Sequence, residues 1–202
     1  MPANPAVSEM HDASPLTVDR LNRMATDAFT ATLADVFEHS PWVAHAAAAM
    51  RPFANIDELH AAMVLVVAQS SAQSQLQLLR AHPELAGRAA LAGELTASST
   101  GEQARAGLNA LQPEELARIM QLNQAYLLRH GFPFIVCVGR HTKQSIMETF
   151  EHRLACATTD ETATALDEVA LIARLRLQAL LARQDETAPT LHTFAAPKGS
   201  RQ

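Results

Sequence analysis

The chain has 202 residues, of which 48% are apolar and 18% charged, a balance typical of a folded globular protein rather than a disordered one. Basic residues number 16 and acidic residues 21, so the formal net charge is −5 and no basic excess points to nucleic acid or to an anionic membrane surface. The length corresponds to one domain and allows a core that needs neither disulfides nor a structural metal.

The two ends of the chain differ in composition from the middle. Residues 1–14 are polar and interrupted by proline, and residues 186–202 combine prolines and a glycine with little periodicity. We therefore expect flexible tails on either side of one compact domain over residues 15–185. No signal-peptide pattern is visible, and the longest apolar run is too short to span a bilayer, so we expect a cytoplasmic protein without a membrane partner.

Apolar residues spaced for one helical face predict helices throughout the compact part. In chain order these are a helix that follows Asp27 and runs to Phe37, one over 42–50 after Ser40-Pro41, one capped by Asn55 or Asp57, one ending before His82-Pro83, and others over 104–111, 113–130, 144–156 and from Asp160 onward. The helix over 113–130 is the best delimited, because proline suits the first helical position and Gly131 suits the position after the last.

Residues 132–138 break the helical pattern. The segment is continuous and apolar, with β-branched residues toward its end, but no second strand candidate exists with which it could pair. We expect an extended, buried connector inside an all-α, single-domain helical bundle. Its backbone N–H and C=O groups would need partners, and a ligand is one candidate.

His82 is the first residue with a position suited to chemistry. Pro83 disfavours helical geometry at the residue before it, so His82 stands at a helix end, and its unperturbed pKa suits proton transfer near neutral pH. The alternative is a purely structural histidine that interacts with the last helical carbonyls.

The segment Ser99-Thr-Gly-Glu102 precedes a partly apolar run and matches a capping box, in which the serine accepts the Glu102 N–H and the glutamate returns to the serine N–H. A helix N-terminus also attracts anionic ligands, so the structural reading does not exclude a functional one.

Two arginines in the last helix are candidates for binding an anion. Arg176 has the apolar neighbours Val169, Ile172 and Leu180, and Arg174 lies at the opposite edge; either could instead extend its stem along the apolar face. The pattern does not choose between them.

Metal and nucleotide motifs are weak or missing. His141 and His152 are too far apart along a helix to share a metal, Cys137 and Cys156 have no zinc-binding spacing and are expected as free thiols, and no glycine-rich phosphate loop occurs.

Several blocks in a fixed order are similar to the 2-oxo-4-hydroxy-4-carboxy-5-ureidoimidazoline (OHCU) decarboxylase family. The most specific are His82-Pro-Glu-Leu-Ala-Gly-Arg88, Ser99-x-x-Glu102-Gln103 and Gly131-Phe-Pro-Phe134. They are accompanied by Phe37-Glu-His-Ser-Pro-Trp42, Arg51-Pro-Phe53, Leu95-Thr96, Ala106-Gly-Leu108, Leu122-Asn123 and the Leu-Arg-Leu triplet that ends at Leu177. The resemblance covers about residues 18–182. It departs at His130, where relatives commonly have an aromatic residue, and in the variable stretch 137–141.

The resemblance implies a site. It assigns catalytic roles to His82, Glu102 and Arg176, which separates Arg176 from Arg174. It assigns substrate contacts to Pro83, Ser99 and Gln103 and to the backbone of a stretch that comprises Phe134, Ile135, Val136, Cys137 and Val138.

The resemblance also implies an activity and an assembly. The expected enzyme is a carboxy-lyase of urate degradation that converts OHCU to (S)-allantoin, a homodimer that uses no metal or organic cofactor and has no nucleic-acid partner. Three alternatives stay open: a related decarboxylase for another ureido acid, a non-catalytic helical binding module, and a metal-dependent hydrolase that uses some of the nine histidines.

Overall fold

The computed structural model describes residues 15–87, 90 and 92–182, and every regular element in these ranges is a helix. Both expected tails, 1–14 and 186–202, lie outside the described residues, and so do residues 183–185 of the expected compact domain. The helices are α1 (Val18–Arg23), α2 (Thr26–Thr32), α3 (Pro41–Ala47), α4 (Ile56–Ala68), α5 (Ala72–Arg80), α7 (Ala97–Arg105), α8 (Pro113–His130), α9 (Lys143–Leu154) and α10 (Thr158–Ala182), with 3-10 turns η1 (Ala48–Met50) and η2 (Val138–Arg140). The all-α prediction is confirmed.

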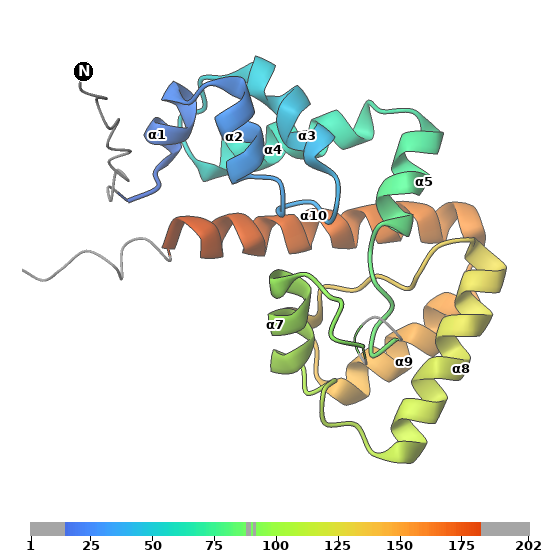
Figure 1. Ribbon diagram of the computed structural model, residues 1–202. Helices are drawn as coiled ribbons and strands as arrows, with labels where there is room; N and C mark the ends of the chain where they lie inside the picture. Colours follow the sequence, from blue (N-terminus) through green and yellow to red (C-terminus); the bar gives the residue numbers. More distant parts are fainter. Residues whose placement is uncertain (1–14, 88–89, 91, 183–202) are drawn as a thin grey trace, which may run out of the picture.

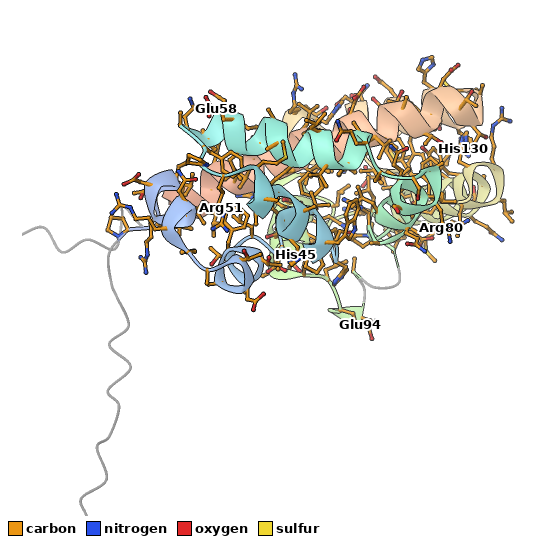
Figure 2. The ribbon with its side chains drawn as sticks, turned by 90° about the horizontal axis from the view of Figure 1, so that it is seen from above. His45, Arg51, Glu58, Arg80, Glu94 and His130 are labelled. Atoms are coloured by element: carbon orange, nitrogen blue, oxygen red, sulfur yellow. The ribbon has the colours of Figure 1, made fainter. Side chains whose placement is uncertain are left out.

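The long helix α10 is the centre of the arrangement. Figure 1 shows α10 running between the N-terminal helices α1–α4 on one side and α7, α8 and α9 on the other. It contacts α4, α5 and α8 directly. Seen from above in Figure 2, α4 lies along α10, with Arg80 and His130 toward one end of the molecule and Glu58 toward the other. No helix among the described residues is long and apolar enough to cross a bilayer.

Most helix boundaries follow from local chemistry. Pro41 and Pro113 each occupy a first helical turn, and Gly131 ends α8 at a φ of 79°, a left-handed value that glycine adopts without strain. At the start of α4, the Asn55 side chain accepts the Glu58 N–H at 3.0 Å, so Asn55 rather than Asp57 is the cap.

Three predicted helices differ from the structure. The helix expected over 104–111 does not form, because α7 ends at Arg105 and the chain turns from Ala106 onward. The helix expected to follow Asp27 and reach Phe37 begins at Thr26 and stops at Thr32, because the chain turns from Leu33 onward to place Val36 and Phe37 in the core. The last helix begins at Thr158, so Asp160 lies in its first turn instead of capping it.

The connector over 132–138 is buried, as predicted, and a buried ion pair holds it. Residues 132–137 lie outside the helices, whereas Val138 begins the 3-10 turn η2. Arg153 of α9 donates from Nη1 to the carbonyl of Ile135 at 2.8 Å, and its guanidinium lies 4.8 Å from the centre of the Phe134 ring. The same arginine binds Glu161 of α10, whose carboxylate also accepts the Tyr126 hydroxyl. Both side chains of the ion pair are nearly inaccessible to water, so each charge depends on the other.

This buried pair predicts a large loss of stability when one partner is removed. In Arg153→Met, Glu161 stays buried without its counter-ion, so the free energy of unfolding should fall by about 3–5 kcal/mol in urea denaturation. The double variant Arg153→Met/Glu161→Leu should recover much of that loss.

The matched control is the exposed pair of Arg118 and Glu151, which are half-accessible and 2.7 Å apart. Arg118→Met should change the unfolding free energy by less than about 1 kcal/mol. If Arg153→Met were as mild as this control, the buried pair would not hold the connector.

Candidate active site

One pocket collects residues from four separate parts of the chain. Counted with the open solvent at its mouth, it has a volume of about 370 Å³. It lies where the end of α5, one face of α7, the connector and α10 meet, and its lining residues are His82, Pro83, Leu85, Ser99, Glu102, Gln103, Phe134, Ile135, Val136, Val138, Ile172 and Arg176. Of the residues expected at the site, only Cys137 is not among them.

His82 enters the pocket from the end of α5. Its Nδ1 lies 3.0 Å from the carbonyl oxygen of Leu78 in the last turn of that helix. A carbonyl can only accept, so Nδ1 carries the proton and the lone pair of neutral His82 is on Nε2. Burial lowers the pKa of His82 from its ordinary value, outweighing the opposing effects of the Leu78 carbonyl and the Glu38 charge. His82 is therefore neutral at pH 7.

Helix α7 supplies three polar side chains from one face. Ser99, Glu102 and Gln103 are three and four positions apart, the spacing of neighbours on a helix surface. The capping-box prediction for Ser99 and Glu102 is wrong, since α7 begins at Ala97 and its cap is Thr96, whose hydroxyl accepts the Ser99 N–H at 3.2 Å. With the cap supplied earlier, both side chains project from inside the helix toward the pocket.

Arg176 lies on α10, and every N–H donor of its guanidinium has a protein acceptor. Nε and Nη2 donate to the two oxygens of Glu102, both at 2.8 Å, and Nη2 also donates to the Ser99 hydroxyl at 3.1 Å. Nη1 donates to Glu38 at 2.6 Å and to the carbonyl of Asp35 at 3.1 Å. Burial opposes the charge of Arg176, but the two carboxylates outweigh that effect and raise its pKa. Arg174 instead pairs with Asp57 outside the pocket, which separates the two arginines.

Glu38 is the polar residue that the sequence reasoning missed. It lies between α2 and α3, is 1% exposed, and accepts hydrogen bonds from Thr96 at 2.7 Å and from Ser99 at 3.0 Å besides its pair with Arg176. Burial alone would raise its pKa, but the charge of Arg176 and these hydrogen bonds outweigh it and hold the pKa of Glu38 below its ordinary value. Glu38 belongs to the block Phe37–Trp42. Its position next to the core residues Val36 and Phe37 was the available sign that it is buried.

The connector lines the pocket, and some of its backbone groups already have protein partners. The Ile135 carbonyl accepts from Arg153, and the Cys137 N–H donates to Glu168 at 2.7 Å. Among the described residues, neither the N–H nor the C=O of the buried, pocket-lining Val136 has a protein hydrogen-bond partner. Burial raises the pKa of the Cys137 thiol, which makes it a poor nucleophile.

The charged groups of the pocket do not form a metal site. Within the described part of the chain, no group of three or more His, Cys, Asp or Glu side chains is placed to hold a metal ion. The arrangement instead combines a neutral imidazole, two carboxylates on one guanidinium and an apolar wall. Such a site can move a proton and orient a small polar molecule.

Comparison with known proteins identifies the family. A family model described as OHCU decarboxylase matches residues 22–178, most of the described chain. A 2-oxo-4-hydroxy-4-carboxy-5-ureidoimidazoline decarboxylase of Haloferax volcanii is 42% identical over 168 residues, which cover 83% of this chain and 96% of that protein. The chain belongs to the OHCU decarboxylase family.

Other relatives place this family member in context. The uric acid degradation bifunctional protein of Bacillus subtilis is 38% identical over 85% of this chain, which corresponds to 34% of that longer protein. A crystal structure of (S)-allantoin synthase aligns with a TM-score of 0.67 and 30% identity, over 82% of this chain and 54% of that one. A structure of OHCU decarboxylase in the presence of (S)-allantoin aligns with a TM-score of 0.60 at 18% identity, over 75% of this chain and 98% of that one, and shows the shared fold.

The burial of His82 in this OHCU decarboxylase family member predicts its titration. We expect a pKa below 6.5, because the imidazolium form loses hydration in the pocket. Titration of the ring by NMR measures it, and the signal missing in His82→Asn provides the assignment. A pKa at or above 6.5 would contradict the dominant effect of burial on His82.

Proposed function

We propose that this protein is a cofactor-free OHCU decarboxylase that forms (S)-allantoin and CO₂ in urate degradation. The observation that carries the proposal is the convergence of His82, Glu102 and Arg176 on one pocket in a chain of this family. The names of its relatives support the substrate, and the pocket has polar and charged side chains that can bind such a molecule.

The reaction replaces the carboxylate of the substrate with a proton. The bond between the ring carbon and the carboxylate breaks, and its electron pair moves into the adjacent C=N system of the imidazoline ring. The hydroxyl on the first carbon loses its proton as that carbon becomes a carbonyl, and the neighbouring ring carbon takes up a proton that sets the stereochemistry. The former C=N nitrogen takes up the one proton that the net reaction consumes. The ring itself accepts the electron pair, so the reaction requires no pyridoxal or thiamine.

His82 is the proposed general acid and base. Its Nε2 carries the lone pair because Nδ1–H binds Leu78, and its lowered pKa keeps that lone pair available at neutral pH. In this role it removes the proton from the substrate hydroxyl as CO₂ leaves.

Glu102 is the proposed ligand for the ureido and ring N–H groups. Its side chain is 21% exposed, whereas the other carboxylate on Arg176 is 1% exposed, so Glu102 is the partner that can turn toward the substrate. An anionic oxygen of the substrate then takes the place of Glu102 on Arg176. Ser99 and Gln103 support this face, and Gln103 is itself oriented by the Ala86 N–H at 2.9 Å.

The connector contributes the remaining contacts. Of the expected backbone ligands, the Val136 N–H and C=O are the proposed substrate contacts, whereas the Ile135 carbonyl and Cys137 N–H serve to fix the segment. Apolar side chains such as Leu85, Phe134 and Ile172 form the other wall. An apolar wall favours neutral CO₂ over the carboxylate it comes from, which assists its loss.

His82→Asn tests the proposed chemistry. The amide has similar size but cannot exchange a proton at neutral pH, so kcat should fall by about 10²-fold or more. The assay uses OHCU generated freshly with uricase and 5-hydroxyisourate hydrolase, contains EDTA, and follows (S)-allantoin by circular dichroism.

The matched control is His45→Asn, because His45 is an exposed histidine on α3 that Figure 2 shows away from His130 and Arg80. It should retain wild-type turnover. Near-wild-type turnover in His82→Asn would remove His82 from the mechanism, and loss of wild-type activity in EDTA would favour a metal-dependent reaction.

We also propose that the enzyme acts as a homodimer in the cytoplasm. Helix α8 leaves Met120, Leu127 and Leu128 exposed by 42% or more, which supports an interface with a second copy. Sedimentation velocity should give twice the mass of the chain, and Leu128→Glu should shift the distribution toward monomer. A monomer at all protein concentrations would refute the dimer.

A further inference from the structure

We propose that Glu38 is a positioning residue, the permanent counter-ion that keeps Arg176 in place while Glu102 exchanges between Arg176 and the substrate. The inference rests on the proposed function for its kinetic part and on geometry alone for its electrostatic part. Two geometric observations carry it.

The first observation is the division of Arg176 between two unequal carboxylates. Glu38 binds Nη1 at 2.6 Å and is 1% exposed, whereas Glu102 binds Nε and Nη2 at 2.8 Å and is 21% exposed. All five guanidinium donors are engaged, so a substrate group can reach Arg176 only if one acceptor withdraws. Glu102 faces the pocket, whereas Glu38 is enclosed behind the guanidinium.

The second observation is that Glu38 is held on all sides. One carboxylate oxygen accepts the Thr96 hydroxyl, and the other accepts the Ser99 hydroxyl and Arg176. Thr96 is the cap of α7, so the carboxylate also lies at the positive end of that helix. The backbone is fixed as well, since the Ser40 N–H donates to the Phe37 carbonyl at 3.0 Å around His39, which has a φ of 46°.

The consequence is that Arg176 does not depend on Glu102 for its position. If Glu102 were the only counter-ion, its departure would leave a buried guanidinium without an anion, at a cost that would keep Glu102 in place. Glu38 removes that cost. Glu102 can then bind the substrate while Arg176 keeps its orientation.

Glu38 also acts on His82 through charge. The charged groups that influence His82 are Glu38 and Glu102, which favour its protonated form, and Arg176, which opposes it. His39 lies 4.0 Å from Glu38 but is largely exposed, so its effect is screened. Loss of the Glu38 charge therefore lowers the pKa of His82.

Glu38→Gln tests both effects. Arg176 would then depend on Glu102 alone, so kcat/KM should fall by about 10- to 100-fold, and the acid limb of its pH profile should move to lower pH. NMR titration should show the pKa of His82 lower than in the wild type. This titration does not require turnover, so it separates failure of the inference from failure of the proposed decarboxylase activity.

Glu38→Asp is the second variant, and it tests the positioning role of Glu38 if Glu38→Gln does not fold. It keeps the charge, so the pKa of His82 should stay near the wild-type value, but the shorter side chain cannot reach Thr96, Ser99 and Arg176 together, so kcat/KM should still fall at least about 10-fold. Glu161→Gln controls for loss of a buried carboxylate paired with arginine; it should lower the melting temperature without moving the His82 pKa.

Two results would overturn the inference. One is wild-type kcat/KM in folded Glu38→Gln or Glu38→Asp. The other is a loss of activity in Glu38→Gln that matches only its loss of folded protein, with the pH profile and the pKa of His82 unchanged.

Discussion

The Arg176 guanidinium is the interaction on which the site depends. Its five donors join the turn before α3, the first turns of α7 and the middle of α10, segments separated by up to 141 residues along the chain. A buried guanidinium is tolerated only when its charge and all its hydrogen bonds are satisfied, so these segments must come together for the chain to fold around it. The packing that completes the core thereby also assembles the pocket.

A second buried arginine fixes another part of the pocket through its pair with a buried carboxylate. Arg153, paired with Glu161, holds the carbonyl of Ile135 and lies against the Phe134 ring, so it fixes the connector that forms one wall of the pocket. Residues 132–137 of the connector belong to no helix, and their backbone groups need partners from side chains or ligands. Arg153 and Glu168 supply part of them, whereas among the described residues the backbone groups of the pocket-lining Val136 have no protein partner.

Local chemistry explains which helix ends and which site residues could be predicted from the sequence. Pro113 and Gly131 delimit α8 through their own backbone preferences, so both ends could be inferred from the sequence. Ser99 and Thr96 are both good caps, and only the tertiary contacts of Ser99 with Glu38 and Arg176 show why Thr96 takes that place. His82, Glu102 and Arg176 were assigned through resemblance to a family. Glu38 was not, because its partner Arg176 is 138 residues away and its place in the block Phe37–Trp42 does not show with which residue it pairs.

In the proposed reaction, this pocket decarboxylates OHCU with its own side chains and delivers a proton to one face of the ring. The direct measurement is circular dichroism of the purified wild-type protein with freshly generated OHCU in EDTA. We expect (S)-allantoin to accumulate rapidly, far faster than the substrate decays spontaneously. Racemic product formed at the rate of the protein-free blank would contradict it.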